Sequence, residues 1–260
     1  MTKRTRALLG WTTALLGVTA SPLASANTWD FSGVVETCNQ FACGIAGIAP
    51  GDQFLGFLKA ADAASGPGQT FGPADVTDYR LLSGAVNVGP ENSEIDSGNL
   101  TTDAADEIVS GTIVFSGTFD GGIFGPIDIT FTLDATNGTW NAETPFLGLG
   151  EVATGTGAFA HEPDGDDHAA IEDNCTLEAN ADQRDTDGDG FGNVCDADFT
   201  NDCATNFADL AVMKGAFFQP GTTDTDMNGD GNTNFADLAE LKKRFFAPPG
   251  PSGVPNICSL

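Results

Sequence analysis

The chain has 260 residues, and its 37 acidic residues outnumber 10 basic ones, which gives a formal net charge of −27. Such a negative surface repels nucleic acid and anionic membranes, so both are excluded as partners, and it favours binding of cations. Six cysteines indicate disulfide bonds and an oxidising compartment.

Residues 1–26 are typical of a signal peptide. A basic start is followed by an apolar run, and Ala24-Ser25-Ala26 provides the small residues at which such signals are cleaved. The apolar run is shorter than the roughly 20 residues of a transmembrane helix. We therefore expect cleavage after Ala26, a secreted or cell-surface location, and no transmembrane segment in the mature chain.

Residues 27–160 are predicted to form a β-domain. Apolar side chains occupy every second position in the runs Trp29–Val34, Thr112–Phe119 and Asp128–Leu133, which is the period of a strand with one buried face. Gly51–Ala64 is assigned to a strand and a loop, and no helix is expected. Asn137-Gly138 predicts a hairpin with a two-residue type I′ turn. The predicted fold class is mainly β, an antiparallel β-sandwich or jelly roll.

An acidic join, HEPDGDDHAAIED, follows the β-domain. It matches part of the twelve-residue frame of an EF-hand calcium loop, in which ligands stand at positions 1, 3, 5, 7, 9 and 12 and glycine at position 6. Positions 1, 3, 5 and 12 are occupied by Glu162, Asp164, Asp166 and Asp173. Asp167 stands at the glycine position and Ala170 at position 9 cannot ligate. A solvated linker and a degenerate calcium site over 162–173 are therefore both open.

Three further stretches fill the same frame. The first offers Asp185, Asp187, Asp189, the carbonyl of Phe191, Asn193 and Asp196. The second, with Cys203 at the glycine position, offers Asp198, Thr200, Asp202, the carbonyl of Ala204, Asn206 and Asp209. The third offers Asp226, Asn228, Asp230, the carbonyl of Asn232, Asn234 and Asp237. Sets of six to eight oxygens suit Ca²⁺, so calcium is the predicted cofactor, with an affinity of order 10⁻⁴ to 10⁻³ M because Asp closes each loop.

A helix is predicted after the second loop and another after the third, because Asn206 and Asn234 are suitable N-caps. Their apolar stripes are predicted to face each other as a small core: Leu210, Met213 and Phe217 in one helix, and Leu238, Leu241 and Phe245 in the other. Helices of about a dozen residues are marginal alone, so metal and a disulfide are expected to stabilise them.

The cysteines are expected to pair by neighbourhood. The expected bonds are Cys38–Cys43, Cys175–Cys195 and Cys203–Cys258. Six cysteines allow about 15 pairings, and a free or intermolecular thiol at Cys203 or Cys258 is the alternative.

Two family resemblances follow from these motifs. The cysteine-bracketed aspartate run, from Asp173-Asn174-Cys175 through Gln183 to Cys195-Asp196, resembles a thrombospondin type 3 repeat, which implies a calcium-wrapped, disulfide-linked segment with little regular secondary structure. The loop-helix pair over 198–246 resembles a type I dockerin, whose family anchors exported enzymes by binding a cohesin. The dockerin resemblance implies recognition residues at loop positions 10 and 11, here Phe207-Ala208 and Phe235-Ala236.

The predicted organisation has four parts: a signal peptide (1–26), a β-sandwich domain (27–160), an acidic linker with a thrombospondin type 3-like repeat (161–197), and a dockerin-like EF-hand pair (198–260). Our first hypothesis is a non-enzymatic exported protein whose C-terminal calcium module mediates attachment or assembly. Calcium and a cohesin-like protein, another surface protein or an extracellular polysaccharide are its expected partners.

Two alternative hypotheses assign the biochemical function to the β-domain. A secreted polysaccharide-acting hydrolase with a dockerin-like tag would need two carboxylates at a working separation. The candidates stand in no recognisable motif: Asp30, Glu36, Asp75, Asp78, Glu94, Asp106, Glu107, Asp120 and Asp128. A carbohydrate-binding sandwich would need an exposed aromatic platform from Trp29, Tyr79 or Trp140.

Overall fold

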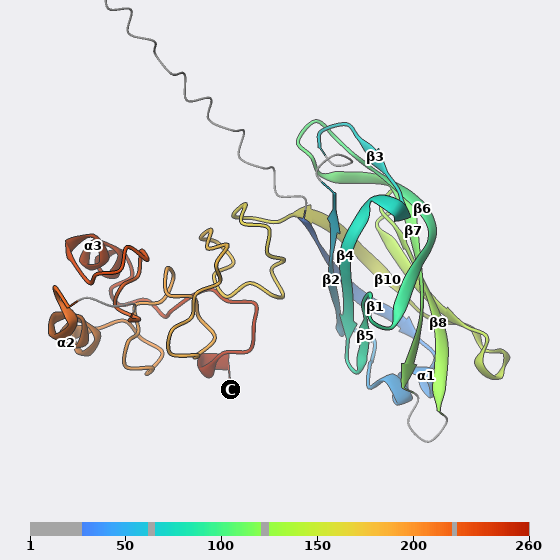
Figure 1. Cartoon of the computed structure of the whole chain (residues 1–260). Coiled ribbons are helices and arrows are strands. Elements are labelled where there is room, and N and C mark those ends of the chain that lie inside the picture. The colour runs from blue at the N-terminus through green and yellow to red at the C-terminus, as the bar shows by residue number, and fades with distance from the viewer. Residues whose placement is uncertain (1–27, 62–65, 121–124, 220–222, 260) are drawn as a thin grey trace, which may run out of the picture.

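The computed structural model describes residues 28–61, 66–120, 125–219 and 223–259, so the predicted signal peptide lies outside the described residues. Two lobes follow each other along the chain (Figure 1): a β-domain, residues 28–161, and a C-terminal module of loops and two helices, residues 162–259. A search of the described residues finds no helix long and apolar enough to span a membrane.

The β-domain is built on one antiparallel sheet, which confirms the predicted mainly β class. In sheet order the strands run β3-β6-β7-β8-β9-β10-β1-β2-β4-β5. Their bounds are β1 Thr28–Cys38, β2 Gln53–Ala60, β3 Thr70–Phe71, β4 Val76–Ser83, β5 Val86–Val88, β6 Ser93–Thr102, β7 Ile108–Asp120, β8 Pro126–Asp134, β9 Thr139–Thr144 and β10 Gly150–His161. The sheet curls so that β5 and β7, which are not neighbours in it, pack against each other. A single curled sheet thus encloses the core in a β-sandwich-like fold, as predicted.

Side chains alternate between core and surface as the sequence period predicts. In β8 the buried set is Ile127, Ile129, Phe131 and Leu133. Across the core, the Phe54 ring packs against the Trp140 ring with centroids 4.4 Å apart. A side chain at Gly155 would collide with this indole and with the carbonyl of Val34, so the close approach of β10 requires glycine.

The hairpin expected at Asn137-Gly138 joins β8 to β9, but the expected two-residue type I′ turn is wrong. Asp134 pairs with Thr139, so residues 135–138 form a four-residue connection. Gly138 has a φ of 64°, whereas Asn137 has no positive φ. The Asp134 carboxylate accepts hydrogen bonds from the amides of Thr136 (3.0 Å) and Asn137 (3.1 Å), and this side-chain-capped turn sets the longer loop.

A short helix, α1 (Gln40–Ala46), interrupts the β-domain where no helix was expected. Asn39 caps it by accepting from the amide of Phe41, and Gly47 ends it with a φ of 66°. The Cys38–Cys43 disulfide ties it to β1. Short 3-10 turns are η1 Pro73–Asp75, η3 Phe146–Gly148 and, at the end of the chain, η4 Ile257–Ser259.

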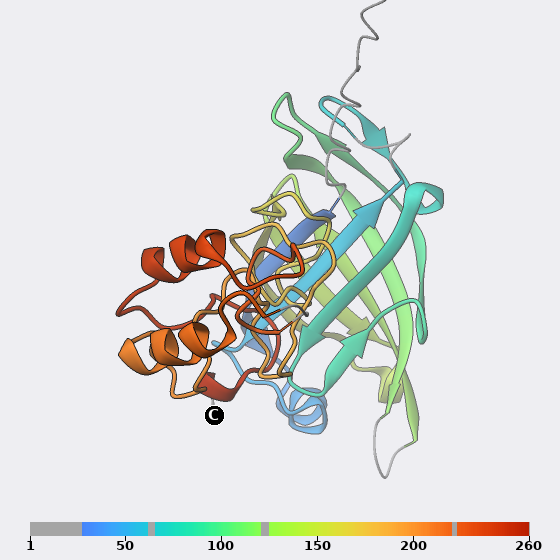
Figure 2. The same ribbon diagram turned by 60° about the vertical axis from the view of Figure 1, so that its left-hand side comes forward.

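The two helices of the C-terminal module, α2 (Phe207–Ala216) and α3 (Phe235–Lys243), confirm the predicted starts, since Asn206 and Asn234 are their N-caps. They lie side by side at the far end of the module (Figure 2). Their facing stripes form the predicted core around Ala197, Met213, Met227 and Leu241, with Leu210, Phe217, Leu238 and Phe245 packed against it.

The two loop-helix units are related by an approximate twofold. The amide after the first helix, at Phe218, donates to Thr233 O at 2.9 Å, and the equivalent amide of Phe246 donates to Thr205 O at 2.8 Å. Each helix therefore ends beside the start of the other.

The three expected disulfides are all present, and no cysteine is free. Cys203 has a φ of 67°, so it adopts the left-handed conformation that the glycine position of the frame requires. Its bond to Cys258 returns the C-terminal tail to the second loop.

Candidate cation sites

The second and third loops share one hydrogen-bonded scaffold. At position 1, the Asp226 carboxylate accepts from the amides of Asp230 (3.1 Å) and Gly231 (3.0 Å), and Asp198 accepts from the amides of Asp202 and Cys203. The carboxylate at position 5 accepts a hydrogen bond from the amide two residues later. In the third loop, Asp230 accepts from the amide of Asn232 at 2.9 Å. These bonds curl the chain around its own carboxylates.

Position 12 closes each of these two loops from the first turn of a helix. Asp209 and Asp237 are both fully buried. Asp237 accepts from the amide of Asn228 at 3.2 Å and from that of Asn234 at 2.8 Å, so it spans the loop from position 3 to position 9. The helix therefore positions a buried carboxylate against the backbone of its own loop.

Asn206 and Asn234, the expected ligands at position 9, have their amides engaged in the scaffold. The Asn234 Oδ1 accepts from the amide of Ala236, and its Nδ2 donates to Asp230 Oδ2 at 2.9 Å and to Asn232 O at 3.0 Å. Asn206 makes the equivalent bonds. These asparagines thus orient the predicted ligands at positions 5 and 7.

The first loop brings its acids together without a helix. Carboxylate oxygens of Asp185, Asp187 and Asp189 lie within 4.8 Å of one another, a grouping that can hold a metal ion. Asp189 is only 4% exposed, and its Oδ2 is buried without a hydrogen-bond partner. Burial raises the pKa of Asp189 to about 6 and that of Asp196 to about 8, with the neighbouring carboxylates adding to both shifts.

Asn193 in the first loop and Thr200 in the second are further side chains expected to donate an oxygen ligand. Asn193 Oδ1 accepts from the amide of Thr186 at 2.8 Å, and its Nδ2 donates to Thr186 Oγ1 at 2.9 Å. Thr200 Oγ1 donates to Asp209 Oδ1 at 3.0 Å. Both side chains thus hold the loop ends together, beside the carboxylates.

Two acids join the first loop from outside its frame. Asp198, position 1 of the second loop, donates its amide to Asp196 Oδ1 at 2.8 Å, and its charge acts on both Asp189 and Asp196. Asp224 has a buried oxygen without a partner, and burial, followed by the charges of Asp187 and Asp185, raises its pKa. Sequence analysis missed Asp224 because it precedes the third frame; the acidic run TTDTD is its only signal.

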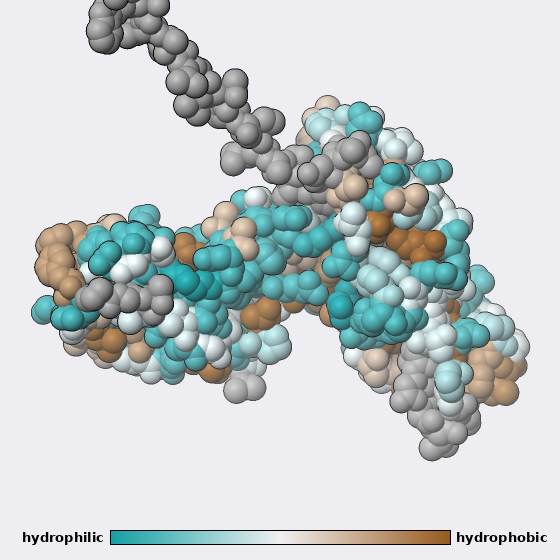
Figure 3. All heavy atoms as spheres, in the orientation of Figure 1, coloured by the Kyte–Doolittle hydropathy of each residue, from teal (hydrophilic) through white to brown (hydrophobic). Residues whose placement is uncertain are grey.

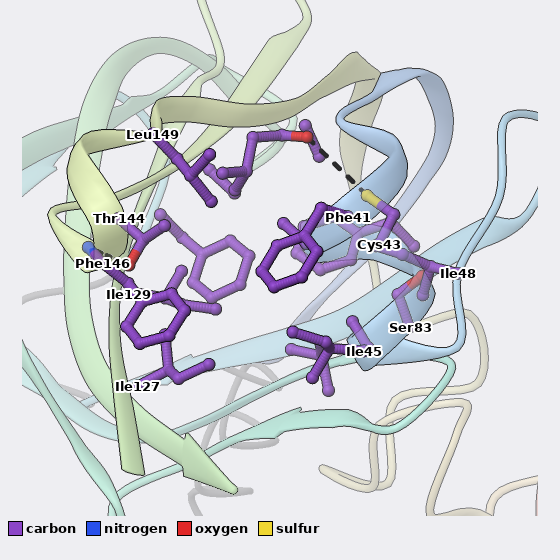
Figure 4. Close-up of a pocket in the computed structure, with 18 of the residues that line it drawn as sticks. Phe41, Cys43, Ile45, Ile48, Ser83, Ile127, Ile129, Thr144, Phe146 and Leu149 are labelled. Atoms are coloured by element: carbon purple, nitrogen blue, oxygen red, sulfur yellow. Dashed lines mark hydrogen bonds between the residues drawn. The ribbon is translucent and has the colours of Figure 1, made fainter. Parts of the chain in front are cut away.

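The enclosed cavity of the β-domain has no such chemistry (Figure 4). Its volume is about 40 Å³, close to the space of one water molecule. Phe41, Ile127 and Phe146 are among its apolar lining. Its two hydroxyls donate to backbone carbonyls, Ser83 to Gln53 O at 2.9 Å and Thr144 to Asp128 O at 2.6 Å. We interpret it as a packing defect of the core.

The aromatic platform that a carbohydrate-binding sandwich would need is not formed by its three candidates, because Trp29, Tyr79 and Trp140 are buried in the core at 0%, 6% and 3% exposure. The pleat directs each ring inward. Several candidate carboxylates have structural partners: Asp128 accepts from Thr118 Oγ1 at 2.8 Å, and Asp106 lies 3.8 Å from His161 Nε2.

In the absence of metal, the acids of the first loop predict that the C-terminal module becomes less stable as the pH rises. Because the folded-state pKa values of Asp189 (about 6) and Asp196 (about 8) exceed the ordinary 3.8, both groups favour folding in their protonated form. Their contribution is complete below pH 4 and is lost as the pH rises through 6 and 8. With EDTA present, the melting temperature of the C-terminal module should therefore fall from pH 5 to pH 9.

Excess calcium should abolish this fall, because the ion then replaces the protons. Thermal melts followed by circular dichroism at each pH, with and without calcium, measure both trends. Asp196→Asn should flatten the EDTA curve. An equal fall in melting temperature with and without calcium would contradict the assignment of the first loop as a cation site.

No family model matches the chain, and no curated protein or solved structure matches it. The assignment of the candidate sites therefore rests on their geometry and chemistry.

Proposed function

We propose that this is an exported calcium-binding protein whose C-terminal module mediates attachment or assembly outside the cell. The observation that carries the proposal is the repeated loop scaffold, in which the carboxylates of Asp226, Asp230 and Asp237 and of their counterparts in the second loop each accept hydrogen bonds from backbone amides of their own loop. The resemblance to a thrombospondin type 3 repeat and a type I dockerin supports the same proposal.

The donor chemistry supports calcium over the common alternatives. All six cysteines are in disulfides and the two histidines, His161 and His168, lie outside the three loops, so soft and borderline metals such as zinc lack their usual ligands. Every predicted ligand is an oxygen atom. Magnesium retains several waters and demands octahedral geometry, whereas calcium accepts six to eight oxygens from a flexible loop.

Paired aromatic clusters on the helices support an attachment role. Phe207 contacts Phe245 and Phe246, and by the approximate twofold, Phe235 contacts Phe217 and Phe218. The exposed members are Phe207 (69%), Phe218 (69%), Phe235 (68%) and Phe246 (76%). Apolar residues also gather at this end of the space-filling view (Figure 3). Exposed aromatic patches on a strongly acidic protein favour an interface, and a cohesin-like or other surface protein is the partner we propose.

Retention of the purified chain on the surface of the producing cells tests this role. We expect retention in calcium and release in EDTA, because the loops hold both aromatic clusters in place. The double variant Phe207→Ser/Phe235→Ser should lose most of the retention. Val212→Ser is the matched control, since Val212 is 42% exposed on α2 but belongs to neither cluster.

Retention on the cells that persists in EDTA would contradict attachment through the C-terminal module. Parallel incubation with insoluble polysaccharides separates the partners: calcium-independent binding to a polysaccharide would place the contact on the β-domain, and not on the helices.

A further inference from the structure

The acidic join between the lobes is folded against the β-domain. Beyond β10 the amide of Glu162 donates to Thr28 O at 3.0 Å, and the Thr28 hydroxyl donates to Asp167 Oδ1 at 2.6 Å. The amide of Ala170 donates to Asp30 Oδ1 at 3.0 Å. In Figure 3 this connection is covered largely by hydrophilic residues. The join is thus an ordered part of the structure, in place of the solvated linker that was one of the two expectations.

Three carboxylates converge within this join, and a fourth is connected to them through a glutamine. Oxygens of Glu162, Asp164 and Asp166 lie within 4.8 Å of one another, and Glu162 and Asp166 are 3% and 8% exposed. Asp173, which is 1% exposed, is connected to them by Gln183, whose Nε2 donates to Asp173 Oδ1 at 2.8 Å and to Asp166 Oδ2 at 3.5 Å. No Lys or Arg in the described chain forms an ion pair with any of the four.

Three of the oxygens in this cluster are left without partners. Both oxygens of Asp164 and Oδ2 of Asp173 are buried with no hydrogen bond. An unpaired buried carboxylate is destabilising, because its charge loses hydration without gaining a compensating partner.

The local geometry repeats that of the other loops. Asp166, at position 5, accepts from the amide of His168 at 2.9 Å, as Asp189 does from Phe191 at 2.8 Å. Asp173, at position 12, accepts from the amide two residues later, as Asp196 does. Asp167, which stands at the glycine position, has a φ of 70°, so the left-handed turn is made despite the missing glycine.

We propose that Glu162, Asp164, Asp166 and Asp173 form a fourth site for a hard divalent cation, calcium in an extracellular setting, and that the ion locks the C-terminal module onto the first strand of the β-domain. The unpartnered oxygens of Asp164 and Asp173 supply ligands that nothing else in the described structure uses. Since residues of the loop itself are hydrogen-bonded to Thr28 and Asp30, binding orders the joint between the lobes. The proposal is independent of the other three loops.

Terbium(III), which occupies calcium sites, can report on this site alone. The chain has three Trp and one Tyr, all before residue 161, so the other three loops lie in a segment with neither residue. Trp29 pairs with His161 across β1 and β10, and their ring centroids are 5.9 Å apart, which places an indole beside the residue that precedes Glu162. Tryptophan-sensitised terbium emission should therefore arise from the fourth site.

The experiment titrates terbium into the full chain after EDTA treatment and gel filtration. We expect sensitised emission that calcium displaces, and terbium affinity about tenfold weaker in Asp164→Asn, the loss typical of a disturbed metal site. Glu151→Gln removes the same charge from an exposed position in β10 and should leave the emission unchanged. Asp230→Asn, in the third loop, should leave it unchanged as well.

Two results would overturn the proposal. In the first, the wild-type chain gives no sensitised emission although calorimetry shows that ions bind to the other loops. In the second, Asp164→Asn gives the same emission as the wild type. If Asp164→Asn loses the wild-type far-ultraviolet circular dichroism, Glu162→Gln replaces it, with the same expected loss of affinity and the same contradicting result.

Discussion

Removal of calcium with EDTA is expected to lower the melting temperature of the C-terminal module strongly, while that of the β-domain stays unchanged. At a calcium concentration 100 times the dissociation constant, each site adds about 2.7 kcal/mol to the free energy of unfolding, or about 8 kcal/mol for three sites. That equals much of the total stability of an ordinary domain, about 5–15 kcal/mol. Apart from its two disulfides, the module has few other sources of stability: its helices have 10 and 9 residues, and its core has Ala197, Met213, Met227 and Leu241 as buried members.

Differential scanning calorimetry of the full chain, with calcium and with EDTA, measures this effect. Fluorescence of Trp29 and Trp140, both in the core of the β-domain, follows that domain separately, and hydrogen exchange of α2 and α3 follows the module. Asp230→Asn should lower the calcium-loaded melting temperature and leave the EDTA value nearly unchanged. A module that melts at the same temperature in both media would refute calcium stabilisation.

Loss of the Cys203–Cys258 disulfide is expected to destabilise the module by about 4 kcal/mol. The bond joins cysteines 55 residues apart, and closing a loop of that length restricts the unfolded chain by about this free energy. The bond also holds the tail on the first loop, where the amide of Ile257 donates to Asp189 O at 3.0 Å and the Ser252 hydroxyl donates to Gly190 O at 2.7 Å. Its removal should therefore also weaken the first cation site.

Urea unfolding of Cys203→Ser/Cys258→Ser in calcium, followed by circular dichroism, measures the loss. Cys38→Ser/Cys43→Ser is the matched control, since it removes a bond between cysteines only 5 residues apart in the β-domain, for an expected loss of about 2 kcal/mol outside the module. An unchanged module transition in the first double variant would show that the metal sites alone hold the tail.

Much of the candidate site was predictable from the sequence, because it depends on local spacing. A carboxylate at every second position followed by a residue able to adopt positive φ defines a loop within twelve residues, and Asn206 and Asn234 mark the helix starts by their own side chains. The alternation in β8 depends on the same short range. The disulfides were predictable because two of the three cysteine pairs are close in the chain.

What the sequence could not provide depends on contacts between distant segments. Asp224 joins the first loop because the start of the third loop folds against it, and nothing near Asp224 in the sequence announces that contact. The curling of the sheet buried Trp29 and Trp140, so they cannot form the platform that a carbohydrate-binding sandwich would need. A local capping bond lengthened the β8–β9 turn, and two capping residues sufficed for α1 without an amphipathic period.

The acidic join illustrates the same division. By itself, the sequence determined that Glu162, Asp164, Asp166 and Asp173 share a loop frame, since that is a matter of spacing along the chain. Only the tertiary structure decided that Glu162, Asp166 and Asp173 are buried near β1, with Asp164 half-buried beside them and oxygens left unpartnered, because burial depends on which surface the segment packs against. Spacing thus specifies the candidate ligands, and packing specifies the buried environment in which the proposed cation would compensate their charge.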